Sequence, residues 1–142
     1  TGELGVLDFG CARTVEAERT DRYLQLLQAM WANDGEWLTQ LYVDLGFARG
    51  EVVMKPEPLL EFNRLALAPF VGTGAFDWGA WSFRSEFQSF MLKHPEFLRL
   101  TPDPEDLLYL RMVSGLRGML QDAGIILDVR EHAERIIAER KL

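Results

Sequence analysis

The residues best suited to binding a metal ion stand near the start of the sequence, in Leu7–Gly10, which reads Leu-Asp-Phe-Gly. The apolar run before them is typical of a buried strand, so Asp8 is expected to follow directly on such a strand. A carboxylate there can hold Mg²⁺, which takes hard oxygen ligands and usually one or two protein carboxylates. Phe9 would pack beneath the site and orient Asp8, while Gly10 would let the chain turn away sharply. A simpler interpretation stays open: Asp8 caps a turn that Gly10 provides.

Helical periodicity predicts about six helices behind this segment. Apolar residues recur at steps of three and four, and caps or breakers bound each run. The helices are expected at about 16–33, 34–46, 56–68, 82–94, 104–124 and from 128 onward. Asp34 is predicted to cap the helix at 34–46 and Gly46 to end it, while Gly124 ends the helix after Pro104 and Asp128 caps the last one. The only strand predicted is the one before Gly10, so the sheet that it needs is expected to lie outside this sequence.

Two helix faces are predicted in detail. The helix after Pro104 has one apolar face made of Tyr109, Met112, Val113, Leu116, Met119 and Leu120. Gly115 and Gly118 interrupt this helix and form helices poorly, so we expect close packing against a neighbour there. In the last helix the residues expected to point inward are Val129, His132, Ala133, Ile136 and Ile137.

Composition narrows the classes of protein. The formal net charge of -7 and the scattered basic residues argue against a nucleic-acid partner. Cys11 is the single cysteine, so an internal disulfide is excluded. No apolar run reaches the roughly 18 residues that span a bilayer. His94 and His132 lack partners at ligand spacing, so zinc is not expected. We therefore expect a cytoplasmic chain, or one peripheral to a membrane.

The segment from Leu7 to Gly46 resembles the UbiB/AarF family of atypical kinases, a group associated with coenzyme Q biosynthesis. In that family, Leu-Asp-Phe-Gly is followed by a short polar link, a helix with a leucine-rich stripe, an Asp-containing turn and a helix closing on Leu-Gly. The same order stands here in "LDFGCARTVEAERTDRYLQLLQAMWANDGEWLTQLYVDLG". The later stretch "LLYLRMVSGLRGMLQDAG" also looks like a block near the family's C-terminus.

The resemblance implies a mainly α fold: the helical C-terminal part of a protein-kinase-like C-lobe with one short N-terminal strand. Residues 1–13 would hold the strand and the metal-binding segment, and 14–142 the helical C-lobe domain. It implies ATP and Mg²⁺ as cofactors of a longer parent, with Asp8 as metal ligand and Phe9 and Gly10 completing the cofactor-binding segment. The kinase N-lobe and catalytic loop would lie before Thr1, so this chain alone is not expected to be an enzyme.

Alternatives stay open at this point. An aminoglycoside- or choline-kinase-like phosphotransferase also ends a strand on a similar Asp motif. A non-enzymatic helical interaction domain would make Asp-Phe-Gly a coincidence. The partners expected are the missing N-lobe, a second copy of the chain, or a lipid or membrane surface. The lipid would be met by an aromatic cluster that otherwise fills a gap between helices: Phe76, Trp78, Trp81 and Phe83.

Overall fold

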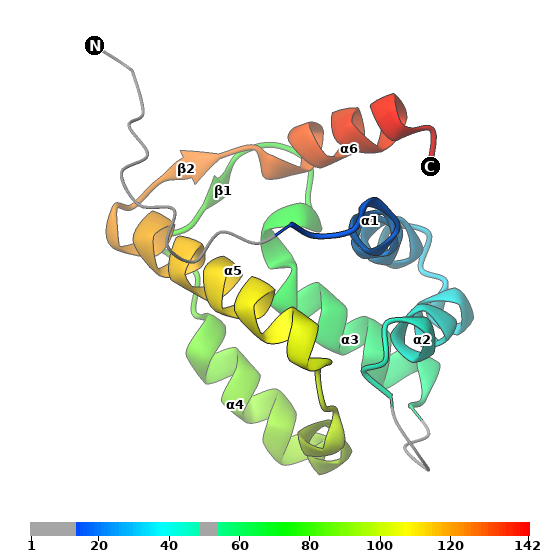
Figure 1. Cartoon of the computed structure of the whole chain (residues 1–142). Coiled ribbons are helices and arrows are strands. Elements are labelled where there is room, and N and C mark those ends of the chain that lie inside the picture. Colours follow the sequence, from blue (N-terminus) through cyan, green and yellow to red (C-terminus); the bar gives the residue numbers. More distant parts are fainter. Residues whose placement is uncertain (1–13, 49–53) are drawn as a thin grey trace.

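The computed structural model describes residues 14–48 and 54–142, and within them the fold is mainly helical (Figure 1). The α-helices are α1 (Ala17–Trp31), α2 (Gly35–Asp44), α3 (Pro56–Ala66), α4 (Phe83–Lys93), α5 (Pro104–Asp122) and α6 (Val129–Arg140). Two short 3₁₀ helices are η1 (Ala68–Phe70) and η2 (Pro95–Arg99), and two strands are β1 (Phe76–Asp77) and β2 (Ile126–Leu127). The predicted mainly α fold is confirmed. The strand predicted before Gly10 lies outside the described residues.

The main core lies between α1, α2 and α3, because each of these helices carries apolar residues at helical spacing. Its most deeply buried members on these helices are Leu26, Ala29, Leu38, Leu41, Leu59 and Leu60. The start of α2 comes so close to α3 that a Cβ at Gly35 would stand 2.6 Å from Cβ of Pro56. That distance is shorter than van der Waals contact, so the approach of the two helices requires a glycine.

One polar pair is buried inside this core. Asn63 donates from Nδ2 to Tyr42 Oη at 3.0 Å and to the carbonyl oxygen of Leu59 at 2.9 Å. Burial raises the pKa of the Tyr42 hydroxyl, because the charged phenolate would lose its solvation there. Each residue of the pair gives the other a hydrogen-bond partner, which the surrounding leucines cannot do.

The helix ends largely follow the predicted caps. Asp34 and Asp128 each accept a hydrogen bond from the backbone N–H three residues further on, at 2.9 and 3.1 Å. Gly46 and Gly124 adopt φ of 77° and 57°, the left-handed conformation that suits glycine after a helix. These predictions are confirmed because capping depends only on residues next to each other in sequence.

Aromatic rings join α4 and η2 to α3. Phe62 of α3 is the centre, with ring centroids at 6.3 Å from Phe87, 5.6 Å from Phe90 and 5.1 Å from Phe97. The rings are tilted rather than stacked face to face, as the quadrupoles of aromatic rings favour. The position of α4 is therefore fixed along its inner side.

Helix α6 packs through a narrow stripe. Ala133 is buried against Leu27 and Met30 of α1. The prediction that His132 and Ile136 point inward is wrong: both are exposed, Ile136 by 41%. The reason is that α6 packs mainly against η1 and α1, so only part of its apolar face is covered.

Helix α5 leaves much of its apolar surface exposed. The large apolar residues exposed on it are Leu107, Leu108, Leu110, Met112, Val113, Leu116 and Met119. The predicted close packing at Gly115 and Gly118 is wrong, because no heavy atom of the described part of the chain lies within 4 Å of a Cβ built at either. Periodicity shows that a helix has an apolar face, not what covers it. In the described ranges, neither α5 nor another helix is long and apolar enough to cross a membrane.

A small antiparallel sheet ties the loop after η1 to the end of α5. Phe76 pairs with Leu127 and Asp77 with Ile126. The N–H of Trp78 extends this pairing by donating to a carbonyl oxygen just before β2, at 3.0 Å. Sequence analysis missed both strands, since two residues are too few to show an alternating pattern.

Candidate functional site

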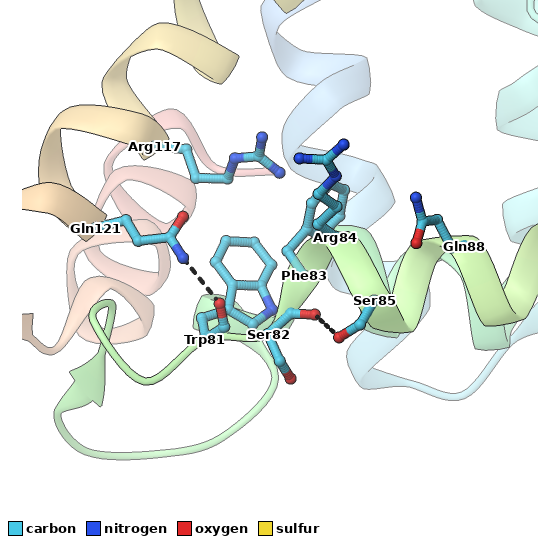
Figure 2. Close-up of a pocket in the computed structure, with 8 residues that line it drawn as sticks. All are labelled: Trp81, Ser82, Phe83, Arg84, Ser85, Gln88, Arg117 and Gln121. Atoms are coloured by element: carbon cyan, nitrogen blue, oxygen red, sulfur yellow. Dashed lines mark hydrogen bonds between the residues drawn. The ribbon is translucent and has the colours of Figure 1, made fainter.

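A pocket of about 290 Å³ opens between the start of α4 and the C-terminal half of α5 (Figure 2). Its lining comes from the α4 side (Trp81, Ser82, Phe83, Arg84, Ser85, Gln88) and from α5 (Arg117, Gln121). Small-molecule sites usually measure about 300 to 1,000 Å³, so this one has room for a small group.

Four aromatic residues support one wall of the pocket. The ring centroids of Phe76, Trp78 and Trp81 lie 5.6 to 5.7 Å from one another, and Phe83 lies 5.1 Å from Trp81. All these pairs are edge-to-face, and Trp78 and Trp81 are only 7% and 8% exposed. The four residues that sequence analysis grouped are thus brought together, with the two tryptophans inside and the two phenylalanines half-buried.

Helix α5 closes the opposite side with two polar side chains. Gln121 donates from Nε2 to the carbonyl oxygen of Trp81 at 3.0 Å (Figure 2). The guanidinium of Arg117 lies over the ring of Phe83, 4.1 Å from its centroid, and 5.9 Å from the ring of Trp81. Such cation–π contacts hold the guanidinium plane against the aromatic wall.

The pocket is rich in donors and carries positive charge. Arg84 and Arg117 line it, and none of its lining residues is acidic. Two N–H groups at this wall, Nε of Arg117 and Nε1 of Trp81, are buried with no hydrogen-bond partner. Sequence analysis missed this site, because Arg84 and Arg117 stand on different helices and belong to no motif.

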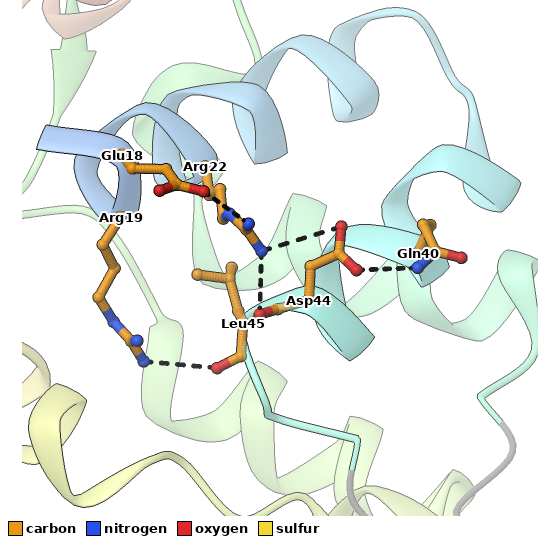
Figure 3. A network of polar contacts seen from close by, with 6 residues as sticks. All are labelled: Glu18, Arg19, Arg22, Gln40, Asp44 and Leu45. Atoms are coloured by element: carbon orange, nitrogen blue, oxygen red, sulfur yellow. Dashed lines mark hydrogen bonds and ion pairs between the residues drawn. The ribbon is translucent and has the colours of Figure 1, made fainter.

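The C-terminal end of α2 is capped by two arginines of α1 (Figure 3). Arg22 donates to the carbonyl oxygen of Asp44 at 3.1 Å, and Arg19 to that of Leu45 at 3.4 Å. Arg22 also pairs with Glu18 at 2.9 Å. Cations are favourable at this end of a helix, where the last carbonyl groups lack partners within the helix.

Arg19 also holds the first turn of α5. It donates from Nε to Oδ1 of Asp106 at 2.7 Å, and its Nη2 pairs with the other carboxylate oxygen. Asp106 stands in the first turn of α5, and its side chain is only 2% exposed. Hydrogen bonding to Asp106 raises the pKa of Arg19, and burial raises the pKa of both Tyr23 and Tyr109, whose rings lie 4.7 Å apart beside the pair.

The residues predicted to bind metal and nucleotide lie outside the described part of the chain. These are Asp8, Phe9 and Gly10, together with the neighbouring Cys11. The magnesium site therefore stays a prediction from sequence.

Elsewhere, His94 ends α4 as expected before Pro95. Its Nδ1 lies 3.3 Å from Glu96 Oε1, and its Nε2 lies 3.6 Å from Glu61 Oε2. The backbone N–H of Glu96 and the nearby His94 lower the pKa of the Glu96 carboxyl. In residues 14–48 and 54–142, no group of three His, Cys, Asp or Glu side chains is placed to hold a metal ion.

Comparison with known proteins finds similarity to an atypical kinase. Over 105 residues, 71% of this chain, the sequence is 30% identical to "Atypical kinase COQ8B, mitochondrial" of Rattus norvegicus. The match covers 19% of that protein, so the chain corresponds to about a fifth of the curated relative's length. This similarity supports a UbiB-like, kinase-related relationship. No family model and no solved structure matches the chain.

Proposed function

We propose that this chain forms the C-terminal helical part of a UbiB-like atypical kinase or ATPase. The observation that carries the proposal is the 30% identity with the atypical kinase COQ8B over 105 residues. A mainly helical fold that follows a Leu-Asp-Phe-Gly motif agrees with the part of a kinase-like C-lobe beyond the metal-binding segment. The proposed link to quinone biosynthesis or lipid homeostasis follows the same relationship.

In this proposal, Asp8 anchors the Mg²⁺ that accompanies ATP, Phe9 packs beneath it and Gly10 lets the chain turn. When bound, the metal ion would neutralise charge on the phosphate groups. Kinase-like enzymes also need a loop over the phosphates, a lysine that pairs with them, and a catalytic-loop Asp and Asn. The rest of the parent would supply these groups, so we expect the chain alone to be inactive.

The exposed face of α5 supports a contact with that remaining part. Met112, Leu116 and Met119 are 58%, 54% and 72% exposed, on the helix with the most exposed large apolar residues in the described ranges. Contiguous exposed apolar surface of this kind usually marks an interaction site. We propose that the missing kinase lobe covers this face, and a second copy of the chain is the alternative occupant.

A lipid contact through the aromatic cluster remains a separate proposal. Because Trp78 and Trp81 are buried, the contact would depend on the half-buried rings of Phe76 and Phe83. Vesicle binding by a Phe83→Ser variant, compared with the unchanged chain, tests the contribution of Phe83; equal binding would remove Phe83 from the contact.

The test of the proposed function is the effect of Asp8→Asn on the full-length parent. We expect Mg²⁺-dependent ATP hydrolysis to be abolished, because the amide cannot supply the negative charge that the metal needs. The matched control is Asp122→Asn, a change at an exposed aspartate at the end of α5. Unchanged ATP turnover in Asp8→Asn would remove Asp8 from the mechanism.

A further inference from the structure

The pocket between α4 and α5 gathers hydrogen-bond donors without an acid to balance them. Arg84 and Arg117 both line it, and neither forms an ion pair within the residues that the structure describes. Nε of Arg117 and Nε1 of Trp81 are buried without an acceptor. Two arginines that line one pocket without ion pairs repel each other, and an anion bound between them would offset that repulsion. The pocket is therefore suited to a ligand that brings acceptors and negative charge.

The arrangement of the two arginines favours a phosphoryl group. Figure 2 shows the side chains of Arg84 and Arg117 extending from different helices toward one space, with the amide of Gln88 beside it. The contact of Arg117 with Phe83, 4.1 Å from guanidinium carbon to ring centroid, orients its planar fork before any ligand arrives. Planar guanidinium groups bind phosphate oxygens two at a time, which a single ammonium group cannot do.

We propose that this pocket binds a phosphoryl dianion, carried either by a soluble phosphate ester or by a phospholipid headgroup. The volume of about 290 Å³ suits a phosphoryl group with a few attached atoms rather than a whole nucleotide. The net charge of -7 gives the whole chain no general attraction for anions, so binding depends on the local arginines. The inference uses no residue of the Leu-Asp-Phe-Gly motif and stands apart from the proposed kinase function.

The first test is a titration of the isotope-labelled 142-residue chain with inorganic phosphate, followed by NMR. We expect the Arg117 Nε–H and Trp81 Nε1–H signals to shift together. Arg84→Gln is expected to weaken binding roughly tenfold or more, because it removes a charged hydrogen-bond donor at an exposed position. The control is Arg111→Gln, which removes the same charge from an exposed site on α5 outside the pocket lining. Equal affinity in Arg84→Gln and Arg111→Gln would overturn the proposal.

The second test separates the two sources of the phosphoryl group. Glycerol 3-phosphate represents the soluble ester, and phosphatidic acid in phosphatidylcholine vesicles represents the headgroup, with pure phosphatidylcholine as reference. Binding of either probe that is lost in Arg84→Gln supports the site and identifies the source. Arg117→Lys keeps the positive charge but replaces the planar guanidinium group by a single ammonium group, so we expect weaker phosphoryl binding than in the unchanged chain. Binding of neither probe, or binding insensitive to both substitutions, would refute the site.

Discussion

Replacing Arg19 by methionine tests whether the ion pair with Asp106 anchors α5. The substitution keeps an apolar stem but leaves the carboxylate of Asp106, whose side chain is 2% exposed, without its counter-charge. Breaking a buried ion pair by removing one partner costs about 3 to 5 kcal/mol. The Arg19 side chain is 24% exposed, so water can reach part of the site and we take the lower end, about 3 kcal/mol.

The assay is thermal and denaturant unfolding followed by circular dichroism. For a chain of this size, about 3 kcal/mol corresponds to a fall in Tm of roughly 10 °C. Arg22→Met is the matched control, because Arg22 stands on the same helix and pairs with Glu18, whose side chain is 77% exposed. An exposed pair contributes about 0 to 1 kcal/mol, so this control should lose far less stability.

The double variant Arg19→Met/Asp106→Leu sharpens the test. Replacing a buried ion pair by apolar residues of similar volume is often neutral, so the double variant should regain most of the loss seen in Arg19→Met. A double-mutant cycle then gives the coupling between the two positions. If Arg19→Met cost no more than Arg22→Met, or the double variant were less stable than both single variants, the anchoring role would be refuted.

Three further predictions concern packing, the α5 face and alkaline pH. Gly35→Ala should destabilise the chain by about 1 to 3 kcal/mol in denaturant unfolding, because the added Cβ meets α3. Gly118→Ala should instead stabilise it by up to about 1 kcal/mol. A Gly35→Ala variant more stable than Gly118→Ala would contradict the packing of α2 on α3. Met119→Glu should change the stability of the isolated chain by no more than about 0.5 kcal/mol, but it should weaken binding to the remaining kinase lobe in a pull-down. Leu92→Glu, at a position 86% exposed on α4, should change neither the stability nor the binding. Burial raises the folded-state pKa of Tyr42 above its ordinary value of 10.0, so stability is complete below pH 10 and declines as pH rises further. Tyrosinate absorbance and circular dichroism should therefore change together above pH 10, and full ionisation with intact helices would refute this.

Features set by neighbouring residues could be predicted from the sequence. Asp34 and Asp128 cap the helices that follow them, and Gly46 and Gly124 end the helices before them. In each case the physical cause, a side chain or a left-handed φ satisfying nearby backbone groups, acts within one turn. The mainly α fold followed from the same local patterns.

Features set by distant residues could not be predicted. Arg19 and Asp106 stand far apart in the sequence, and nothing near either shows that they meet. Arg84 and Arg117 reach one pocket only because α4, the β1–β2 pairing and the end of α5 are placed together. The apolar residues of α5 were recognised, but their exposure depends on what packs there, which periodicity does not contain.

Calorimetric titration of Mg-ATP tests the central claim most directly, performed on the full-length parent and on the 142-residue chain. If the chain is the C-terminal part of a kinase-like protein that holds the metal through Asp8, the parent should bind Mg-ATP and the isolated chain should show little affinity. Micromolar binding by the isolated chain, or no binding by the full-length parent, would contradict the proposal.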